Sequence, residues 1–251
     1  MLKIGLDAGH WLHEPGRRCL KSLDPNETRE WQLNARVAQF TENLLSLYDC
    51  EVTRLDDTTG QKEITLEERV RTANQLELDV VISIHHNGGA DGTDSGGTVV
   101  YCSKNASEVS KQLQNALYHY CIQKAGLKGN RANPMPQAAH YITTYTKMPA
   151  VLIECGFMDS STDVPVILTD AFASKITESI VTALTEVFYL GAPPLKKEDG
   201  PFPWSAEARK WAEETGLISG YGDGSMGYDK SVTREELVVI LHKFSKLIGG
   251  C

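Results

Sequence analysis

Two runs of aliphatic, mostly β-branched residues constrain the fold of this chain more than any other feature. Residues 80–84 read Val-Val-Ile-Ser-Ile, and residues 149–153 read Pro-Ala-Val-Leu-Ile, so both runs are nearly continuous in apolar side chains. A strand with this pattern is typically buried on both faces, as in a parallel sheet that helices cover from both sides. The two runs therefore predict an α/β fold with a twisted, mostly parallel sheet flanked by helices.

The rest of the first 190 residues alternates between strand and helix patterns around these two runs. Shorter strands are predicted at residues 2–6, 50–55 and 97–102. Helices are predicted from residue 28 onward, from the capping box at residues 65–68, and over residues 106–125 and 172–189. The alternation of the two element types supports the same layered architecture.

The composition changes at Gly191, which marks a domain boundary. Residues 191–203 contain four prolines and no apolar periodicity, as expected for a linker. Residues 204–251 predict one helix over 205–214, a glycine-rich turn, and a second helix that a capping box opens at Thr233. We therefore expect one domain at residues 1–190, a linker at residues 191–203 and a small module of two helices at residues 204–251.

The charge balance and the absence of long apolar runs exclude several classes of partner. The formal net charge is −8, with an isoelectric point near 5.4, whereas proteins that bind nucleic acid broadly carry a basic surface. No run reaches the ~18 apolar residues of a membrane span. No signal peptide precedes the first predicted strand, so we expect synthesis in the cytoplasm.

Polar residues follow three predicted strands at the point where each strand ends. The strand at residues 2–6 continues into Asp-Ala-Gly-His at residues 7–10, the run at residues 80–84 into His-His-Asn at residues 85–87, and the run at residues 149–153 into Glu154. Open α/β sheets bind ligands beyond the carboxyl ends of their strands. We therefore expect these side chains to meet at one edge of the sheet.

A further carboxylate, Glu30, lies one helical step before the apolar stripe that starts at Leu33. This position faces the core, where an unpaired charge is costly unless it is neutralised or binds a metal. Two imidazoles and a carboxylate are a ligand set typical of zinc hydrolases, and here a second carboxylate is expected nearby. The pattern alone therefore indicates a metallohydrolase.

Each of these residues also has a purely structural interpretation. His10 could belong to a turn, Glu30 could complement a helix dipole, and Glu154 could be an ion-pair partner. His85 and His86 are adjacent on a strand and face opposite sides, so only one of them is expected to bind a metal. The expectation that all of these residues lie together at one edge of the sheet favours the functional interpretation.

The chain resembles the zinc-dependent N-acetylmuramoyl-L-alanine amidases of the amidase-3 family. Six segments carry the resemblance: DAGH (7–10), EWQLN (30–34), LEERVRTAN (66–74), SIHHN (83–87), GGTVVYC (96–102) and KMPAVLIECGF (147–157). The resemblance implies one zinc ion per chain, held by His10, Glu30 and His85, with Glu154 as the catalytic acid and base. The implied reaction is hydrolysis of the amide bond between N-acetylmuramic acid and L-alanine in peptidoglycan.

Two more residues are candidates at this edge. We expect Asp7 to support a ligand histidine, and Asn87 to contact either a ligand or the substrate. The loop after His10 departs from the family's glycine-rich pattern, so the substrate contacts of that loop are not carried over. Two other functions stay open: a zinc peptidase that cuts the stem peptide, and a catalytically idle protein that only binds the wall.

The C-terminal module resembles a single S-layer homology motif. Residues 203–224 and 233–237 carry this resemblance, which implies binding to a secondary cell-wall polymer, with dimerisation or simple packing as alternatives. The whole chain would then act at the bacterial cell wall after release, as a phage endolysin or as a host autolysin.

Overall fold

The computed structural model describes residues 1–191, 206–221, 225–228, 232–247 and 249. The chain divides into two compact units, Met1–Pro194 and Leu195–Cys251. The division lies within the segment 191–203 predicted as a linker, most of which is outside the described residues. Each unit is considered by itself below.

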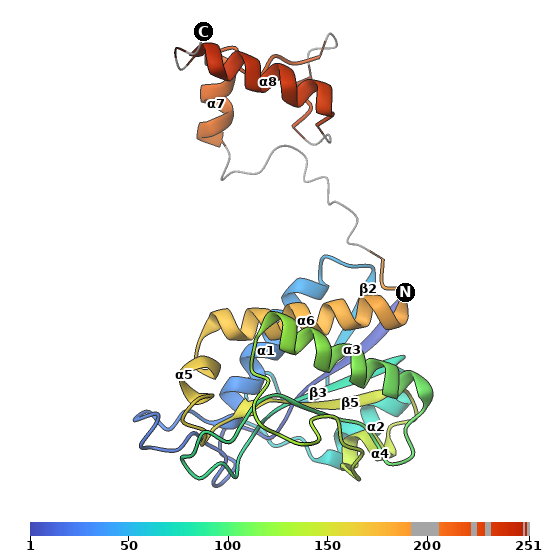
Figure 1. Cartoon of the computed structure of the whole chain (residues 1–251). Coiled ribbons are helices and arrows are strands. Elements are labelled where there is room, and N and C mark those ends of the chain that lie inside the picture. The colour runs from blue at the N-terminus through green and yellow to red at the C-terminus, as the bar shows by residue number, and fades with distance from the viewer. Residues whose placement is uncertain (192–205, 222–224, 229–231, 248, 250–251) are drawn as a thin grey trace. The chain divides into compact units, whose positions relative to one another are not determined.

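A five-stranded sheet forms the centre of the first unit (Figure 1). Its strands are β1 (Leu2–Ala8), β2 (Cys50–Arg54), β3 (Val80–Asn87), β4 (Val99–Tyr101) and β5 (Ala150–Phe157). They lie in the order β2-β1-β3-β5-β4. Neighbouring strands are parallel except for β4, which runs antiparallel to β5. The predicted α/β fold with a mostly parallel sheet is therefore confirmed.

The reversed direction of β4 follows from the connection that precedes it. A crossover helix normally returns the chain to the edge where a parallel strand starts. Residues 88–98, which join β3 to β4, contain no helix. The chain therefore enters β4 from the edge at which β3 ends, and β4 runs back along β5.

Helices cover both faces of this sheet, as Figure 1 shows. On one face lie α1 (Glu30–Leu45), α3 (Glu108–Lys124) and α6 (Asp170–Phe188). On the other lie α2 (Leu66–Gln75) and α4 (Tyr141–Tyr145). Strand alternation sends Ile82 of β3 into the larger core with α1, α3 and α6, and sends Val81 into a smaller core beneath α2 and α4.

The sequence did not predict two short helices, α4 and α5 (Val164–Ile167). They have five and four residues, which is too short to show a helical apolar period. The predicted capping box of α2 is present, because Thr65 Oγ1 accepts a hydrogen bond from Glu68 N and the Glu68 side chain accepts one from Thr65 N.

The second unit contains α7 (Ala206–Glu214) and α8 (Arg234–Leu247). The predicted capping box opens α8: Thr233 N donates to Glu236 Oε2 at 2.7 Å, and Glu236 N donates to Thr233 Oγ1 at 3.1 Å. Part of the predicted glycine-rich turn, residues 222–224, is outside the described residues. Of the helices in the described part of the chain, none is long and apolar enough to cross a membrane.

Candidate active site

The carboxyl-end edge of the sheet brings together the residues that the sequence singled out. Gly9 and His10 directly follow β1, and His85 lies near the end of β3. His85 is paired in register with Glu154 on β5. Glu30 is the first residue of α1, which packs against β1 and β3. Four elements that are distant in sequence thus meet at one point.

Glu30 lies between the two imidazoles. His85 Nδ1 donates a hydrogen bond to Glu30 Oε1 at 3.0 Å, and His10 Nε2 lies 3.3 Å from Glu30 Oε2. The His10 and His85 rings meet edge to face, with centroids 5.0 Å apart. One donor atom from each of the three residues lies within 4.8 Å of the other two. Across the described residues, this is the one group of histidines, cysteines and carboxylates with that geometry.

The charges in this cluster are strongly coupled. Burial opposes ionisation of Glu30, but the imidazoles of His10 and His85 outweigh burial and hold the pKa of Glu30 below its usual range. Burial also lowers the pKa of His85, but Glu30 outweighs this effect and raises that pKa overall. Glu30 is therefore a charged carboxylate that is only 1% exposed.

The donor set fits a transition-metal ion. Two imidazole nitrogens and one carboxylate oxygen are ligands that zinc accepts in tetrahedral sites. Glu30 Oε2 is buried and makes no hydrogen bond of good geometry, although His10 lies close to it. A buried carboxylate oxygen without a hydrogen bond is costly unless a cation neutralises it.

Arg69 on α2 holds the loop that carries His10. The backbone of His10 has φ +66°, a left-handed conformation that is uncommon for residues other than glycine. Arg69 donates to the carbonyl oxygens of Ala8 at 2.8 Å and of His10 at 2.7 Å. It also pairs with Asp7, which is 1% exposed and accepts a second hydrogen bond from Ser83. Asp7 therefore supports the His10 loop indirectly, because it pairs with the Arg69 side chain that bonds the His10 carbonyl oxygen.

Gly9 and Asn34 fix the distance between β1 and its neighbours. A Cβ atom at Gly9 would collide with the His85 ring, so only glycine fits there. Asn34, one turn after Glu30 on α1, donates to Gly9 O at 3.1 Å and accepts a hydrogen bond from His86 Nδ1 at 2.8 Å. The EWQLN segment contains Asn34, but its spacing alone does not reveal these two contacts.

His86 lies on the opposite face of β3 from His85 and packs toward α1. It is 2% exposed, and burial lowers its pKa to about 3, which keeps its imidazole neutral. Its Nδ1 is occupied by Asn34. The structure therefore places His85 in the cluster and His86 outside it.

Glu154 on β5 and Asn87 at the end of β3 lie at the same edge of the sheet as the cluster. Glu154 Oε2 is buried without a hydrogen-bond partner among the described residues, and burial raises the pKa of Glu154 to about 7. The Asn87 side chain accepts a hydrogen bond from Gly88 N at 2.8 Å and also bonds Tyr101. Because the pKa of Glu154 lies near neutral pH, its carboxyl group can both accept and donate a proton there.

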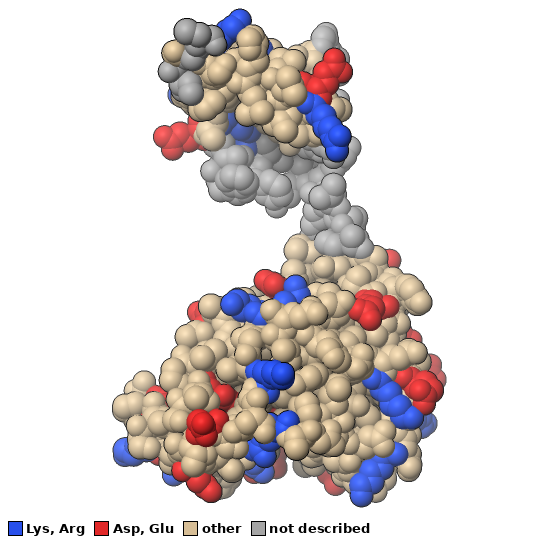
Figure 2. All heavy atoms as spheres, viewed as in Figure 1, with Lys and Arg blue, Asp and Glu red and all other residues tan. Residues whose placement is uncertain are grey.

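A cavity of about 300 Å³ adjoins the cluster on the face that α2 and α4 cover. His10, His85, Trp11 and His140 are among the residues that line it. The surface of the first unit carries Lys and Arg side chains mixed with Asp and Glu on the face drawn in Figure 2.

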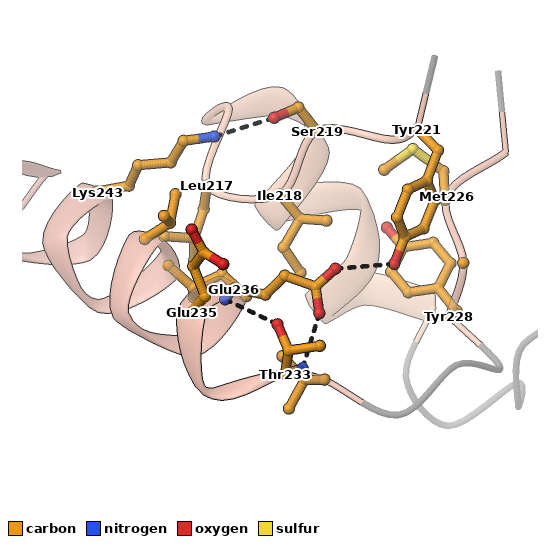
Figure 3. A pocket seen from close by; sticks show the side chains of 14 residues that line it. Leu217, Ile218, Ser219, Tyr221, Met226, Tyr228, Thr233, Glu235, Glu236 and Lys243 are labelled. Atoms are coloured by element: carbon orange, nitrogen blue, oxygen red, sulfur yellow. Dashed lines mark hydrogen bonds between the residues drawn. The ribbon is translucent and has the colours of Figure 1, made fainter. Parts of the chain in front are cut away.

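The second unit has a cleft of its own, with a volume of about 520 Å³ (Figure 3). Tyr221 OH donates to Glu236 Oε1 at 3.1 Å at one end of the cleft. At the other end, Lys243 Nζ donates to Ser219 Oγ at 3.0 Å. Apolar side chains such as Ile218 lie between the two ends. The cleft combines aromatic, hydroxyl and charged groups.

Comparison with known proteins identifies relatives of the first unit. The Amidase_3 family model, described as N-acetylmuramoyl-L-alanine amidase, matches residues 4–186. The chain is 29% identical over 187 residues to the probable cell wall amidase LytH of Staphylococcus epidermidis, a match that covers 74% of this chain and 58% of that protein. It is 27% identical over 210 residues to the endolysin of Bacillus phage SPP1, with 79% and 72% coverage.

Solved structures share the fold of the first unit. The catalytic domain of CwlV, an N-acetylmuramoyl-L-alanine amidase from Bacillus (Paenibacillus) polymyxa var. colistinus, superimposes with a TM-score of 0.67 at 24% identity. That comparison covers 76% of this chain and 100% of the domain. The amidase from Clostridium difficile 630 gives the same TM-score and identity, covering 75% and 97%.

The Asp7–Arg69 pair gives a test of how the His10 loop is held. Replacing Arg69 with Met leaves the buried carboxylate of Asp7 uncompensated, and we expect the free energy of unfolding to fall by about 3–5 kcal/mol. Arg71→Met is the matched control, because Arg71 lies on the same helix with its side chain 59% exposed, and its effect should stay within about 0.5 kcal/mol. Denaturant titration measures both values, and equal losses would contradict this role of Arg69.

Proposed function

Because the chain belongs to the Amidase_3 family of N-acetylmuramoyl-L-alanine amidases, we propose that it hydrolyses peptidoglycan at the amide bond between N-acetylmuramic acid and L-alanine. The proposed reaction depends on one zinc ion per chain. The cluster of His10, Glu30 and His85, with the buried Glu154 on the neighbouring strand, is the observation that carries this proposal. Three protein ligands leave a zinc ion an open position for water or substrate.

In this proposal the three ligand residues hold the ion through one ring nitrogen each from His10 and His85 and a carboxylate oxygen from Glu30. When bound, zinc supplies a Lewis acid that polarises the amide carbonyl and lowers the pKa of water. Glu30 remains charged although it is buried, so it can neutralise part of the ion's charge. Arg69 keeps the His10 loop in its left-handed conformation for this purpose.

Glu154 moves the proton. It accepts a proton from the attacking water at a carboxylate oxygen while the water oxygen bonds to the acyl carbon. The carbon–nitrogen bond then breaks, and Glu154 passes the proton to the departing nitrogen. The products are the free lactyl carboxyl group of N-acetylmuramic acid and the free amine of L-alanine. The raised pKa of Glu154, about 7, suits a group that must take and return a proton.

We propose that this activity is exerted at the bacterial cell wall, as a phage endolysin or a host autolysin. Relatives named a probable cell wall amidase and an endolysin support this location. We further propose that the C-terminal unit is a separate domain of the S-layer homology type. In this proposal it attaches the enzyme to a secondary cell-wall polymer. The cleft with Tyr221, Glu236 and Lys243 supports this role, because aromatic faces and polar groups together suit a sugar polymer.

The role of Glu154 is tested by replacing it with Gln, which keeps size and polarity but removes proton transfer. We expect turnover of soluble muropeptides to fall roughly 10²–10⁴-fold. Zinc content should not change, because Glu154 is not a ligand. Mass spectrometry of wall digested by the unmodified chain should show new L-alanine amines. New termini within the stem peptide would indicate a peptidase. Full activity of the E154Q variant would exclude Glu154 as the group that transfers the proton.

The two adjacent histidines give a second test, read out as metal content. His85→Ala should lose zinc, because it removes one of three ligands. His86→Ala should keep stoichiometric zinc, although it is expected to be less stable because the bond to Asn34 is lost. Elemental analysis of the folded variants measures the ratio of zinc to protein. Loss of zinc in H86A alone would reverse the assignment.

A third test separates the two units. A chain that ends after Gly191 retains all four site residues and the buried Leu190, so we expect it to fold and bind zinc. It should cleave soluble muropeptides as fast as the full chain and degrade intact walls more slowly, because tethering raises the local concentration. The isolated unit should sediment with purified walls, whereas a dimer in solution would indicate self-association instead. If truncation abolished muropeptide turnover, the second unit would belong to the active fold.

A further inference from the structure

His140 lies at the proposed active site but has no part in the chemistry described above. It directly precedes α4, and its ring lines the cavity of about 300 Å³ together with His10 and His85. It therefore faces the space that adjoins two of the proposed zinc ligands. The segments in the sequence that resemble known amidases do not include it.

The surroundings of His140 place its ring in a fixed position. The ring meets Tyr101 edge to face, with centroids 4.6 Å apart. Tyr101 is paired in register with Leu152 of β5, two residues before Glu154. The backbone carbonyl of His140 accepts hydrogen bonds from Thr144 N and Thr143 Oγ1, which tie it to the first turn of α4. Burial, followed by the charge of His85, lowers the pKa of His140 and keeps the imidazole neutral.

The ring itself is not satisfied. Nε2 of His140 is buried and has no hydrogen-bond partner among the described residues. Three further atoms in the same condition, Glu30 Oε2, Glu154 Oε2 and His86 Nε2, also belong to groups that interact electrostatically with His85. Buried polar atoms are nearly always paired in folded proteins, so unpaired atoms gathered around one residue call for an explanation. The proposed zinc ion accounts for Glu30 Oε2 and the water proton for Glu154 Oε2, whereas His86 lies outside the cluster and does not line the cavity.

We propose that His140 binds the substrate, through a hydrogen bond from its imidazole to an amide group next to the bond that is cut. The inference rests on the proposed function, which places an amide-linked substrate in this cavity. An amide offers both a carbonyl acceptor and an N–H donor, so a neutral imidazole can pair with it in either tautomer. His140 thus positions the substrate against Glu154 and the ligand cluster.

The alternative is that His140 only packs against Tyr101, and His140→Phe separates the two roles. Phenylalanine keeps an aromatic ring against Tyr101 and removes both ring nitrogens. We expect kcat/KM for a soluble muropeptide to fall about 5- to 100-fold, mainly through a higher KM, as for the loss of one buried hydrogen bond. Zinc content should equal that of the unmodified chain. His140→Gln, which restores a polar group at similar reach, should recover part of the loss.

Two further measurements complete the test. His119→Phe is the matched control, because His119 lies on α3 and its Nδ1 bonds only Asn115 O of its own helix. Its kcat/KM should be unchanged. In the E154Q background, calorimetry should show the same muropeptide binding more weakly to H140F, independently of turnover.

Unchanged kcat/KM and unchanged binding in H140F would overturn the inference, as would loss of zinc in that variant. If the unmodified chain did not cleave the muropeptide, the proposed function and the inference would both fail. Cleavage by the unmodified chain, together with an unaffected H140F variant, would contradict the inference alone.

Discussion

The buried carboxylate of Glu30 is the interaction on which the rest of the site depends. A charge that is 1% exposed is tolerated only where opposite charge or strong donors face it. Here two imidazoles do so, one from the loop after β1 and one from β3. Their approach requires that β1 and β3 be adjacent and parallel, and that the N-terminus of α1 reach the same edge. The sheet order β2-β1-β3-β5-β4 therefore does more than bury a core, because it brings together residues 10, 30 and 85, the proposed metal ligands.

Around this carboxylate, each supporting residue performs one positioning task. Arg69 bridges the Asp7 side chain and two carbonyls of the His10 loop, Gly9 leaves room for the His85 ring, and Asn34 joins that loop to β3 through His86. These residues hold the side chains of the cluster in place, which would limit the reorganisation needed to bind the proposed zinc ion. Glu154 differs from them because its Oε2 is buried without a hydrogen-bond partner in the described part of the chain, and burial raises its pKa.

The main features of this fold were predictable because burial on both faces leaves a continuous apolar run, which marked β3 and β5. Glu30 was predictable because it lies one helical step before an apolar stripe, on the face that turns toward the core. The direction of β4 was not predictable, because its apolar residues do not indicate from which edge of the sheet the chain enters the strand. Arg69 and Arg71 look alike in sequence, yet one is 3% exposed and the other is on the surface. His140 precedes a five-residue helix with no period to orient it, so only the folded chain places it beside His85.

The account's central claim, that the first unit is built to hold a zinc ion, is tested most directly by X-ray absorption spectroscopy at the zinc edge of the purified full chain. The account predicts one zinc per chain, with a shell that contains two imidazole nitrogens and a carboxylate oxygen at about 2.0–2.2 Å and no sulfur. A shell with sulfur ligands would place the ion at cysteines outside the cluster. That result, or a chain that binds no stoichiometric zinc when it is offered, would contradict the account.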